Sequence, residues 1–259
     1  MTKSLQGRRA IVTGAATGIG RTTAEHLREA GARVHICDID EAALEAAASA
    51  LPGLGTGLCD VSDENQVEGF FREAVANLGG LDILINNAGI AGPTAPVEEI
   101  DPQSWARTLA VDLTGQFLCA RKAVPLLKAS GGGAIINVSS AGGRFGYPMR
   151  TPYAAAKWGI IGLTKTLAME LGSFSIRVNA LCPGFVAGDR LERVIATKAK
   201  IQGVPVDALR DTYLDLNSLQ SFVAPEQIAQ TMVFLCTPAG AAISGQVIAV
   251  DGDLRTLRV

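Results

Sequence analysis

The 259-residue chain has only two histidines and five cysteines. His26 and His35 both lie near the N-terminus and have no metal-ligand spacing around them. This scarcity disfavours a Ser-His-Asp hydrolase and a His-rich zinc site, and we predict no bound metal. The odd number and wide scatter of the cysteines indicate reduced thiols and a cytoplasmic location. These cysteines are Cys37, Cys59, Cys119, Cys182 and Cys236.

Long hydrophobic runs and an excess of charge are also missing. No run reaches the roughly 18 apolar residues that span a bilayer, and residues 1–9 lack the apolar stretch of a signal peptide. The formal net charge is −2, which gives no electrostatic attraction for nucleic acid. We therefore expect neither a membrane nor a nucleic acid as partner, but a small-molecule substrate. An apolar content of 48% with 19% charged residues predicts a folded domain.

Short apolar runs alternate with longer helical patterns along the chain. The predicted strands lie at 10–12, 34–37, 57–59, 83–85, 134–138, 178–181 and 247–250. The main helical patterns lie at 21–30, 41–50, 64–78, 104–128 and 153–171. Strands separated by helices pair in parallel, and continuous apolar runs indicate burial on both faces. The sequence thus predicts one α/β domain over 1–259, a doubly wound Rossmann-type fold with a seven-stranded parallel sheet and helices on both faces.

One segment, about 185–224, departs from this alternation. It contains no predicted strand and two helical patterns, at 190–200 and 206–216. It follows the sixth strand, whose carboxyl end faces the ligand crevice in such folds. We interpret the segment as a cover for the substrate. The alternative is an ordinary surface pair of helices.

The first strand runs into a glycine-rich turn that opens a helix. Residues 13–20 read TGAATGIG. Glycines allow a tight turn and a close approach of pyrophosphate, and the helix N-terminus supplies free N–H groups. A plain tight turn is the alternative, but the strand–turn–helix context favours dinucleotide binding. The residues predicted to bind the cofactor here are Gly14, Thr17, Gly18, Ile19 and Gly20.

Asp38 ends the second predicted strand, 18 residues after Gly20. A carboxylate in this place accepts hydrogen bonds from the adenosine ribose and repels a 2′-phosphate. Ile39 and Asp40 follow, with no arginine beside them, and Thr17 is uncharged. The sequence therefore favours NAD over NADP. The alternative role for Asp38 is a helix N-cap.

Two further strand ends contribute to the predicted cofactor site. Asp60, after the third strand, is placed to accept from the adenine amino group, with Val61 packing beside it. The fourth strand ends in Asn87, Ala88 and Gly89, whose small side chains would admit the cofactor.

Tyr153 and Lys157 are four residues apart in a helical pattern and so share one helix face. An ammonium beside a phenol favours the phenolate, so Tyr153 could act as general base on an alcohol or as acid on a ketone. Lys157 could also hold the nicotinamide ribose. Ser140, 13 residues upstream, could orient the reacting oxygen. The alternatives are a surface pair without a role and simple turn chemistry at the serine.

Taken together, the glycine turn, the NNAG run at 86–89, the Ser140, Tyr153 and Lys157 set and the Pro183-Gly184 pair resemble the short-chain dehydrogenase/reductase family. The resemblance runs from residue 7 to residue 252 and is to an NAD-preferring branch like the 3-oxoacyl reductases. It implies that the three residues form a catalytic triad and that the protein is a homotetramer. It also implies cofactor contacts from Ile19, Asp38, Asp60, Val61, Asn87, Pro183, Gly184 and Val186.

The chain departs from the family pattern in two places. Asp112 stands where family members usually carry an asparagine that holds a water in a proton relay to the lysine. Asp112 is predicted either to serve that relay as a catalytic residue or to be a structural acceptor. Gly188 stands where the family often has a threonine that touches the nicotinamide amide.

Several arginines lie near the predicted catalytic residues. Arginine suits a bidentate grip on a carboxylate, so we predict a small polar substrate of the sugar-acid type. The alternative is that these arginines are solvated or contact other subunits. The predicted substrate residues are Arg144, Tyr147, Arg150 and Arg190.

The predicted function is NAD-dependent interconversion of a secondary alcohol and a ketone. One alternative is an NADPH-dependent 3-oxoacyl-[acyl-carrier-protein] reductase, which Asp38 disfavours. An alternative of another class is a non-catalytic NAD(H)-binding regulator, which the intact Ser140, Tyr153 and Lys157 disfavour.

Overall fold

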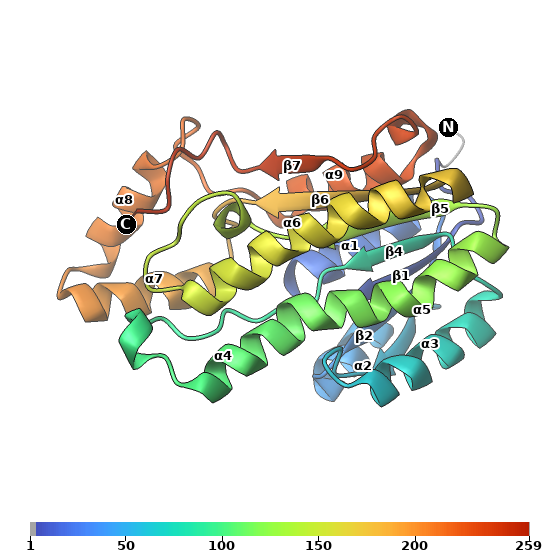
Figure 1. The fold of residues 1–259 in the computed structure, drawn as a ribbon, viewed down its shortest axis with the longest axis horizontal. Helices are drawn as coiled ribbons and strands as arrows, with labels where there is room; N and C mark the ends of the chain where they lie inside the picture. The colour runs from blue at the N-terminus through green and yellow to red at the C-terminus, as the bar shows by residue number, and fades with distance from the viewer. Residues whose placement is uncertain (1–3, 259) are drawn as a thin grey trace.

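A computed structural model describes residues 4–258 and contains a seven-stranded sheet in the order β3-β2-β1-β4-β5-β6-β7 (Figure 1). Every neighbouring pair is parallel. This confirms the predicted doubly wound α/β fold. The strands are β1 (Arg9–Thr13), β2 (Arg33–Asp38), β3 (Gly55–Leu58), β4 (Ile83–Asn86), β5 (Gly133–Val138), β6 (Ile176–Pro183) and β7 (Val247–Val250).

Helices cover both faces of the sheet, and the ribbon view shows α3 to α6 in front of it with α1 and α9 behind (Figure 1). The predicted helix at 104–128 is divided by a π-helical turn, Ala110–Thr114, and α9 was not predicted at all. The helices are α1 (Gly18–Glu29), α2 (Glu41–Ala50), α3 (Glu64–Leu78), α4 (Pro102–Leu109), α5 (Gly115–Ala129), α6 (Thr151–Leu171), α7 (Asp189–Gln202), α8 (Val206–Asp215) and α9 (Pro225–Cys236).

The strands bury side chains on both faces because successive residues point to opposite sides of a sheet. In β1, Ala10 and Val12 join the apolar core under α1, α2 and α9, whereas Ile11 joins the core under α3 and α5. This division explains why the strands are uniformly apolar in sequence. A third apolar cluster lies away from the sheet, among α7, α8 and the C-terminal tail, and includes Leu209 and Leu257.

The strand order reverses at β1, which pairs with β2 on one side and β4 on the other. Connections leave the sheet in opposite directions at such a point, and this opens a crevice beyond the carboxyl ends of the strands. The long connection after β6, which carries α7 and α8, lies at the same end of the molecule (Figure 1). Within the described residues, no helix combines the length and apolarity needed to cross a membrane.

Candidate active site

A cleft of about 610 Å³ opens at the carboxyl ends of the strands. All the predicted site residues except Asp112 and Arg144 line it. Its walls come from the turn after β1, the ends of β2 to β6, the start of α6, α7 and the tail residue Leu257. Within residues 4–258, no group of histidine, cysteine and carboxylate side chains is arranged to hold a metal ion.

The glycine turn is locked to the end of β4 by hydrogen bonds. The Asn87 amide donates to the carbonyl oxygens of Thr13 and Gly14, at 3.0 and 2.8 Å. In return, the Thr13 hydroxyl accepts from the backbone N–H groups of Asn87 and Ala88, both at 3.1 Å. A Cβ atom on Gly20 would lie 2.5 Å from the Asn87 amide nitrogen, so only glycine fits. The turn is therefore held in one shape by its own neighbours.

The N-terminus of α1 opens onto the cleft without a side-chain cap. Its N-cap residue, Thr17, makes no capping hydrogen bond. The first N–H groups of a helix lack intrahelical partners, and the helix dipole adds positive potential there. Gly18, Ile19 and Gly20, which open α1, all line the cleft. The arrangement fits the pyrophosphate of a dinucleotide.

Asp38 faces the glycine turn at the end of β2. One carboxylate oxygen accepts from the backbone N–H of Ala16 at 3.0 Å, and the other from that of Ile39 at 2.8 Å. The N-cap of α2 is Asp40, which accepts from Ala43. The alternative of Asp38 as the helix cap is therefore wrong. Asp38 lines the cleft beside the turn, where the ribose of a dinucleotide would lie.

Asp60 and Val61 line the cleft beyond β3 and are joined there by Arg107, which sequence reasoning missed. Arg107 extends from α4 and donates to Asp60 at 2.9 Å. Burial raises the pKa of Asp60, but hydrogen bonds from Ser62 and Arg107 outweigh it, so the pKa lies below its usual range. Arg107 is 47 residues from Asp60, so no local motif could have paired them.

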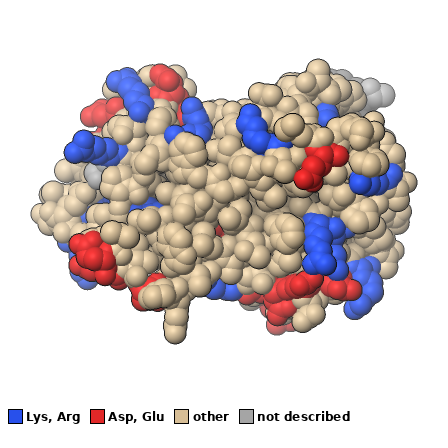
Figure 2. Space-filling model, viewed as in Figure 1, with Lys and Arg blue, Asp and Glu red and all other residues tan. Residues whose placement is uncertain are grey.

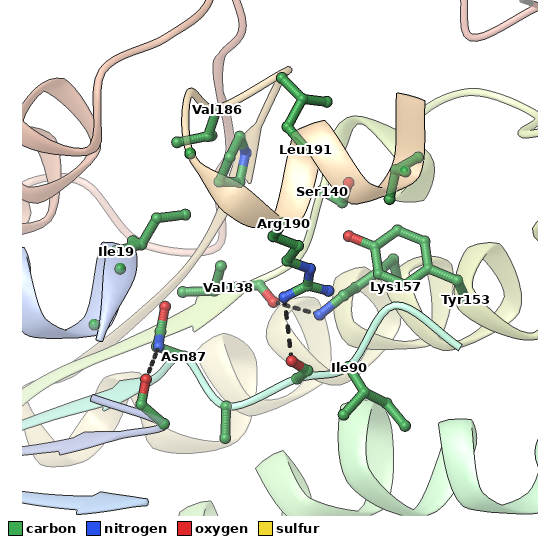
Figure 3. Close-up of a pocket in the computed structure, with 18 of the residues that line it drawn as sticks. Ile19, Asn87, Ile90, Val138, Ser140, Tyr153, Lys157, Val186, Arg190 and Leu191 are labelled. Carbon is green, nitrogen blue, oxygen red and sulfur yellow. Dashed lines mark hydrogen bonds between the residues drawn. The ribbon is translucent and has the colours of Figure 1, made fainter. Parts of the chain in front are cut away.

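Tyr153 and Lys157 lie on the same face of α6, as predicted from their spacing. The Lys157 ammonium lies 5.5 Å from the centre of the Tyr153 ring. Ser140 follows β5, and its hydroxyl accepts from the backbone N–H of Gly142 at 3.1 Å. Figure 3 shows the Tyr153 hydroxyl pointing into the cleft toward Ser140, with the Lys157 ammonium below it. An alcohol or ketone oxygen placed between the two hydroxyls would contact both.

The Lys157 ammonium contacts the buried carboxylate of Asp112. Its ammonium donates to the Val138 carbonyl at 3.2 Å and lies 3.4 Å from Asp112. The other oxygen of Asp112 accepts from the backbone N–H of Ile90 at 2.7 Å. Asp112 sits in the π-helical turn, fully buried, and does not line the cleft. It thus positions Lys157 and the loop after β4, and its relay role stays a prediction.

The predicted substrate residues divide into two groups. Arg144 makes an ion pair with Asp251 at 2.6 Å and does not line the cleft, and its substrate role stays a prediction. Arg150 is 2% exposed, and its guanidinium carbon lies 4.8 Å from the centre of the Tyr153 ring. Arg190 donates to the Gly89 carbonyl at 3.1 Å across the mouth of the cleft (Figure 3). Arg150 and Arg190 therefore stay as candidates, with Tyr147 beside them.

Known proteins resemble the chain over nearly its whole length. A family model described as enoyl-(acyl carrier protein) reductase matches residues 14–254. A cis-4-hydroxycyclohexanecarboxylate dehydrogenase from Sinomonas cyclohexanicum is 39% identical over 256 residues, covering 97% of this chain and 98% of the relative.

Two solved structures share the fold and differ in the nucleotide they contain. An NAD⁺-bound xylitol dehydrogenase is 29% identical to the chain, with a TM-score of 0.92. The match covers 96% of this chain and 100% of the dehydrogenase chain. A variant of actinorhodin polyketide ketoreductase with NADPH is 31% identical to the chain, with a TM-score of 0.91. The match covers 95% of this chain and 96% of the ketoreductase chain.

Proposed function

The chain belongs to the short-chain dehydrogenase/reductase family and is an oxidoreductase, and from this premise we propose that it interconverts a secondary alcohol and a ketone with NAD. The observation that carries the proposal is the meeting of Ser140, Tyr153 and Lys157 with Asp38 in one cleft. The glycine turn, the uncapped start of α1 and Asp38 fit a dinucleotide. When bound, NAD supplies the hydride acceptor.

The side chains supply the proton chemistry. In oxidation, Tyr153 takes the proton of the substrate hydroxyl while Ser140 donates a hydrogen bond to the same oxygen. The Lys157 ammonium lies beside the Tyr153 ring and lines the same cleft. Asp112 and the Val138 carbonyl keep that ammonium in place. In reduction, Tyr153 returns the proton to the carbonyl oxygen.

The choice of NAD rests on Asp38. Its carboxylate faces the turn where the adenosine ribose would lie, and a 2′-phosphate there would meet a like charge. Asp38 therefore also disfavours an NADPH-dependent 3-oxoacyl reductase of the same fold.

We infer a small alcohol that bears a carboxylate as the substrate. Arg150 and Arg190 bring two guanidinium groups to the ring of Tyr153, with guanidinium carbons at 4.8 and 6.0 Å from its centre. The relative from Sinomonas is named for such a compound, a hydroxycyclohexanecarboxylate. Residues 185–224, with α7 and α8, would cover it.

The test is a panel of matched substrate pairs. Each pair contains a hydroxy acid and its carboxamide, on cyclohexane, butyrate and sugar-acid skeletons, and NADH or NADPH formation is followed by absorbance. We expect the acids to be oxidised with NAD in preference to the amides and to NADP. Faster turnover of oxoacyl thioesters with NADPH would support the reductase alternative. Tight NADH binding without turnover of any alcohol or ketone would support a non-catalytic regulator.

We also propose a homotetramer that works in the cytoplasm. The five cysteines are free thiols, which suits a reducing compartment. Four large apolar side chains are exposed on α4, α5 and α6: Trp105, Phe117, Trp158 and Met169. The face over α5 and α6 carries few charges in its centre (Figure 2). Light scattering should give four times the chain mass, and Trp158→Glu should lower it; a wild-type monomer would refute the assembly.

A further inference from the structure

A cluster of buried polar atoms that lack hydrogen-bond partners lies behind the substrate side of the cleft; its member Arg150 lines the cleft, whereas Lys198 and Tyr213 do not. The Lys198 ammonium, the Arg150 Nε–H and the Tyr213 hydroxyl are all buried and unpaired, apart from the interaction of the Tyr213 hydroxyl with that of Tyr147. The Arg150 Nη2 group donates to the Ala91 carbonyl at 2.7 Å, so only part of this guanidinium is satisfied. Buried polar groups in folded proteins are almost always paired. Three unpaired groups in one cluster indicate that something is still to bind there.

Lys198 is the most unusual member of the cluster. It lies on α7 and is 0% exposed, within the apolar cluster formed by α7, α8 and the tail. Its ammonium lies 4.9 Å from the centre of the Tyr147 ring and 5.9 Å from that of Tyr213. Among the described residues, no carboxylate lies within ion-pair distance of it, and the charge that acts on it is a second cation, Arg150. An unpaired buried cation is costly, and a second cation beside it adds to the cost.

All three unpaired groups are hydrogen-bond donors, or can be. An ammonium and a guanidinium donate only, and a tyrosine hydroxyl can donate. The missing partner must therefore accept hydrogen bonds, and the two positive charges require it to be an anion. A planar carboxylate matches the geometry of a guanidinium and suits this donor set.

Tyr147 connects the cluster to the catalytic residues. Its ring lines the cleft, with its centre 6.5 Å from that of Tyr153. The Arg150 guanidinium carbon is 5.2 Å from the Tyr147 ring centre, so Arg150 lies against both tyrosines. Lys198 and Tyr213 are fully buried and do not line the cleft, so the cluster lies behind Tyr147, and a ligand reaches these two residues only when the Tyr147 side chain moves aside.

We propose that Lys198, Arg150 and Tyr213 form a subsite around Tyr147 that binds the carboxylate of the substrate. This inference rests on the proposed function for its link to catalysis, but the subsite can be tested by binding alone. It adds Lys198 and Tyr213 to the specificity residues and gives α7 and α8 a chemical role besides covering the cleft.

Burial, together with the charge of Arg150, lowers the pKa of Lys198 to about 8. A bound carboxylate stabilises the ammonium and raises this pKa, so binding takes up a proton above pH 8. Carboxylate affinity should accordingly fall as the pH rises through about 8. Tyr147 and Tyr213, which also face Lys198, do not titrate there, because burial raises their pKa values.

The experiment measures binding of cyclohexanecarboxylate and of cyclohexanecarboxamide to the NADH-saturated enzyme by calorimetry. We expect the wild type to bind the carboxylate and Lys198→Met to weaken that binding about 30-fold or more, because a buried charged hydrogen bond is lost. The amide should bind equally to both. Lys200→Met is the matched control, because Lys200 lies on the same helix and is exposed. It should leave carboxylate binding unchanged.

Thermal unfolding and the pH profile separate this role from a structural one. Lys198→Met replaces an unpaired buried cation by an apolar side chain, so its Tm should rise. The fall in carboxylate affinity above pH 8 should disappear in this variant. A lower Tm with carboxylate binding and its pH profile retained would overturn the subsite, as would a wild type that binds neither probe. Tighter binding of inorganic phosphate than of the carboxylate would overturn the assignment to a carboxylate.

Measurements of hydroxy-acid oxidation distinguish a failure of the subsite from a failure of the proposed function. If the wild type oxidises hydroxy acids but Lys198→Met keeps the same preference for acid over amide, the subsite is wrong and the function stands. If the carboxylate binds in a Lys198-dependent way but no alcohol is oxidised, the subsite stands and the function fails.

Discussion

The polar groups in the two halves of the cleft differ in whether they have hydrogen-bond partners. On the nucleotide side, Asn87 and Asp38 make hydrogen bonds to the backbone of the glycine turn, and the Thr13 hydroxyl accepts from the backbone after β4. On the substrate side, Lys198 and Arg150 keep buried donors without partners. The nucleotide half is therefore held in shape before any ligand binds, whereas the substrate half is completed by its ligand.

The difference separates what the family shares from what is particular to this chain. A dinucleotide presents the same pyrophosphate whatever the substrate, so a turn fixed by backbone contacts can bind it independently of the substrate. Substrates differ, and the connection after β6 supplies side chains that can vary without disturbing the sheet.

The largest effect on kcat/KM is expected at Tyr153, where the nucleotide half and the substrate half of the cleft meet. Tyr153→Phe should lower kcat/KM by about a thousandfold or more, because the proton acceptor is lost. The NADH dissociation constant should change little, because the glycine turn is untouched. Steady-state kinetics and NADH fluorescence titration measure the two quantities. A variant that keeps its activity would show that another group moves the proton.

A rigid nucleotide half should not tolerate an added methyl group. Gly20→Ala places a Cβ atom 2.5 Å from the Asn87 amide nitrogen. Overpacking of this kind costs about 1–3 kcal/mol, so NADH affinity should fall about 10- to 100-fold. The matched control is Gly69→Ala on α3, where nothing lies within 4 Å of the added atom. Equal NADH affinity in both variants would show that the turn adapts.

The cofactor preference should respond to one carboxylate. Asp38→Asn removes the negative charge, so kcat/KM with NAD should fall about tenfold and kcat/KM with NADP should rise. Asp40→Asn changes the neighbouring cap of α2 and should leave the ratio of the two values unchanged. Should both variants shift the ratio alike, helix capping rather than ribose recognition would explain it.

The smallest effect on catalysis is expected at the opposite end of the sheet. Asp82 accepts from the Arg9 guanidinium at 2.7 Å and from the Arg9 backbone at 2.8 Å, which ties the connection before β4 to β1. Burial raises the pKa of Asp82, but these bonds outweigh it and hold the pKa below its usual range. Its contribution to stability is therefore present at neutral pH and is lost as the pH falls through the depressed pKa.

Asp82→Asn should lower the free energy of unfolding by about 1–3 kcal/mol at pH 7, with kcat/KM unchanged. Denaturant unfolding at pH 7 and at low pH measures this, and the difference from wild type should shrink in acid. A loss of activity without a loss of stability would show that the two ends of the sheet are coupled.

Sequence reasoning found most of the nucleotide half because its signals are local. The glycine turn, Asp38 and the Tyr153–Lys157 spacing each lie within a few residues of one another or of a strand end. Arg107 was missed because long-range packing brings it to the cleft, and Lys198 because its place behind Tyr147 depends on how α7 packs. The ion pair of Arg144 with Asp251 could not be foreseen either, because the two residues are 107 positions apart. Helix α9 was missed although its buried residues Ile228, Ala229, Met232 and Leu235 recur at helical spacing.

The most direct test of the account follows one hydrogen atom. A hydroxy acid that the enzyme oxidises is prepared with deuterium on the carbinol carbon and incubated with NAD, and the reduced nucleotide is analysed by mass spectrometry. The account predicts one deuterium on the nicotinamide ring in wild type and almost no reduced nucleotide with Tyr153→Phe over the same time. Reduced nucleotide without deuterium would contradict direct hydride transfer, and equal labelling by Tyr153→Phe would contradict the assigned role of the phenol.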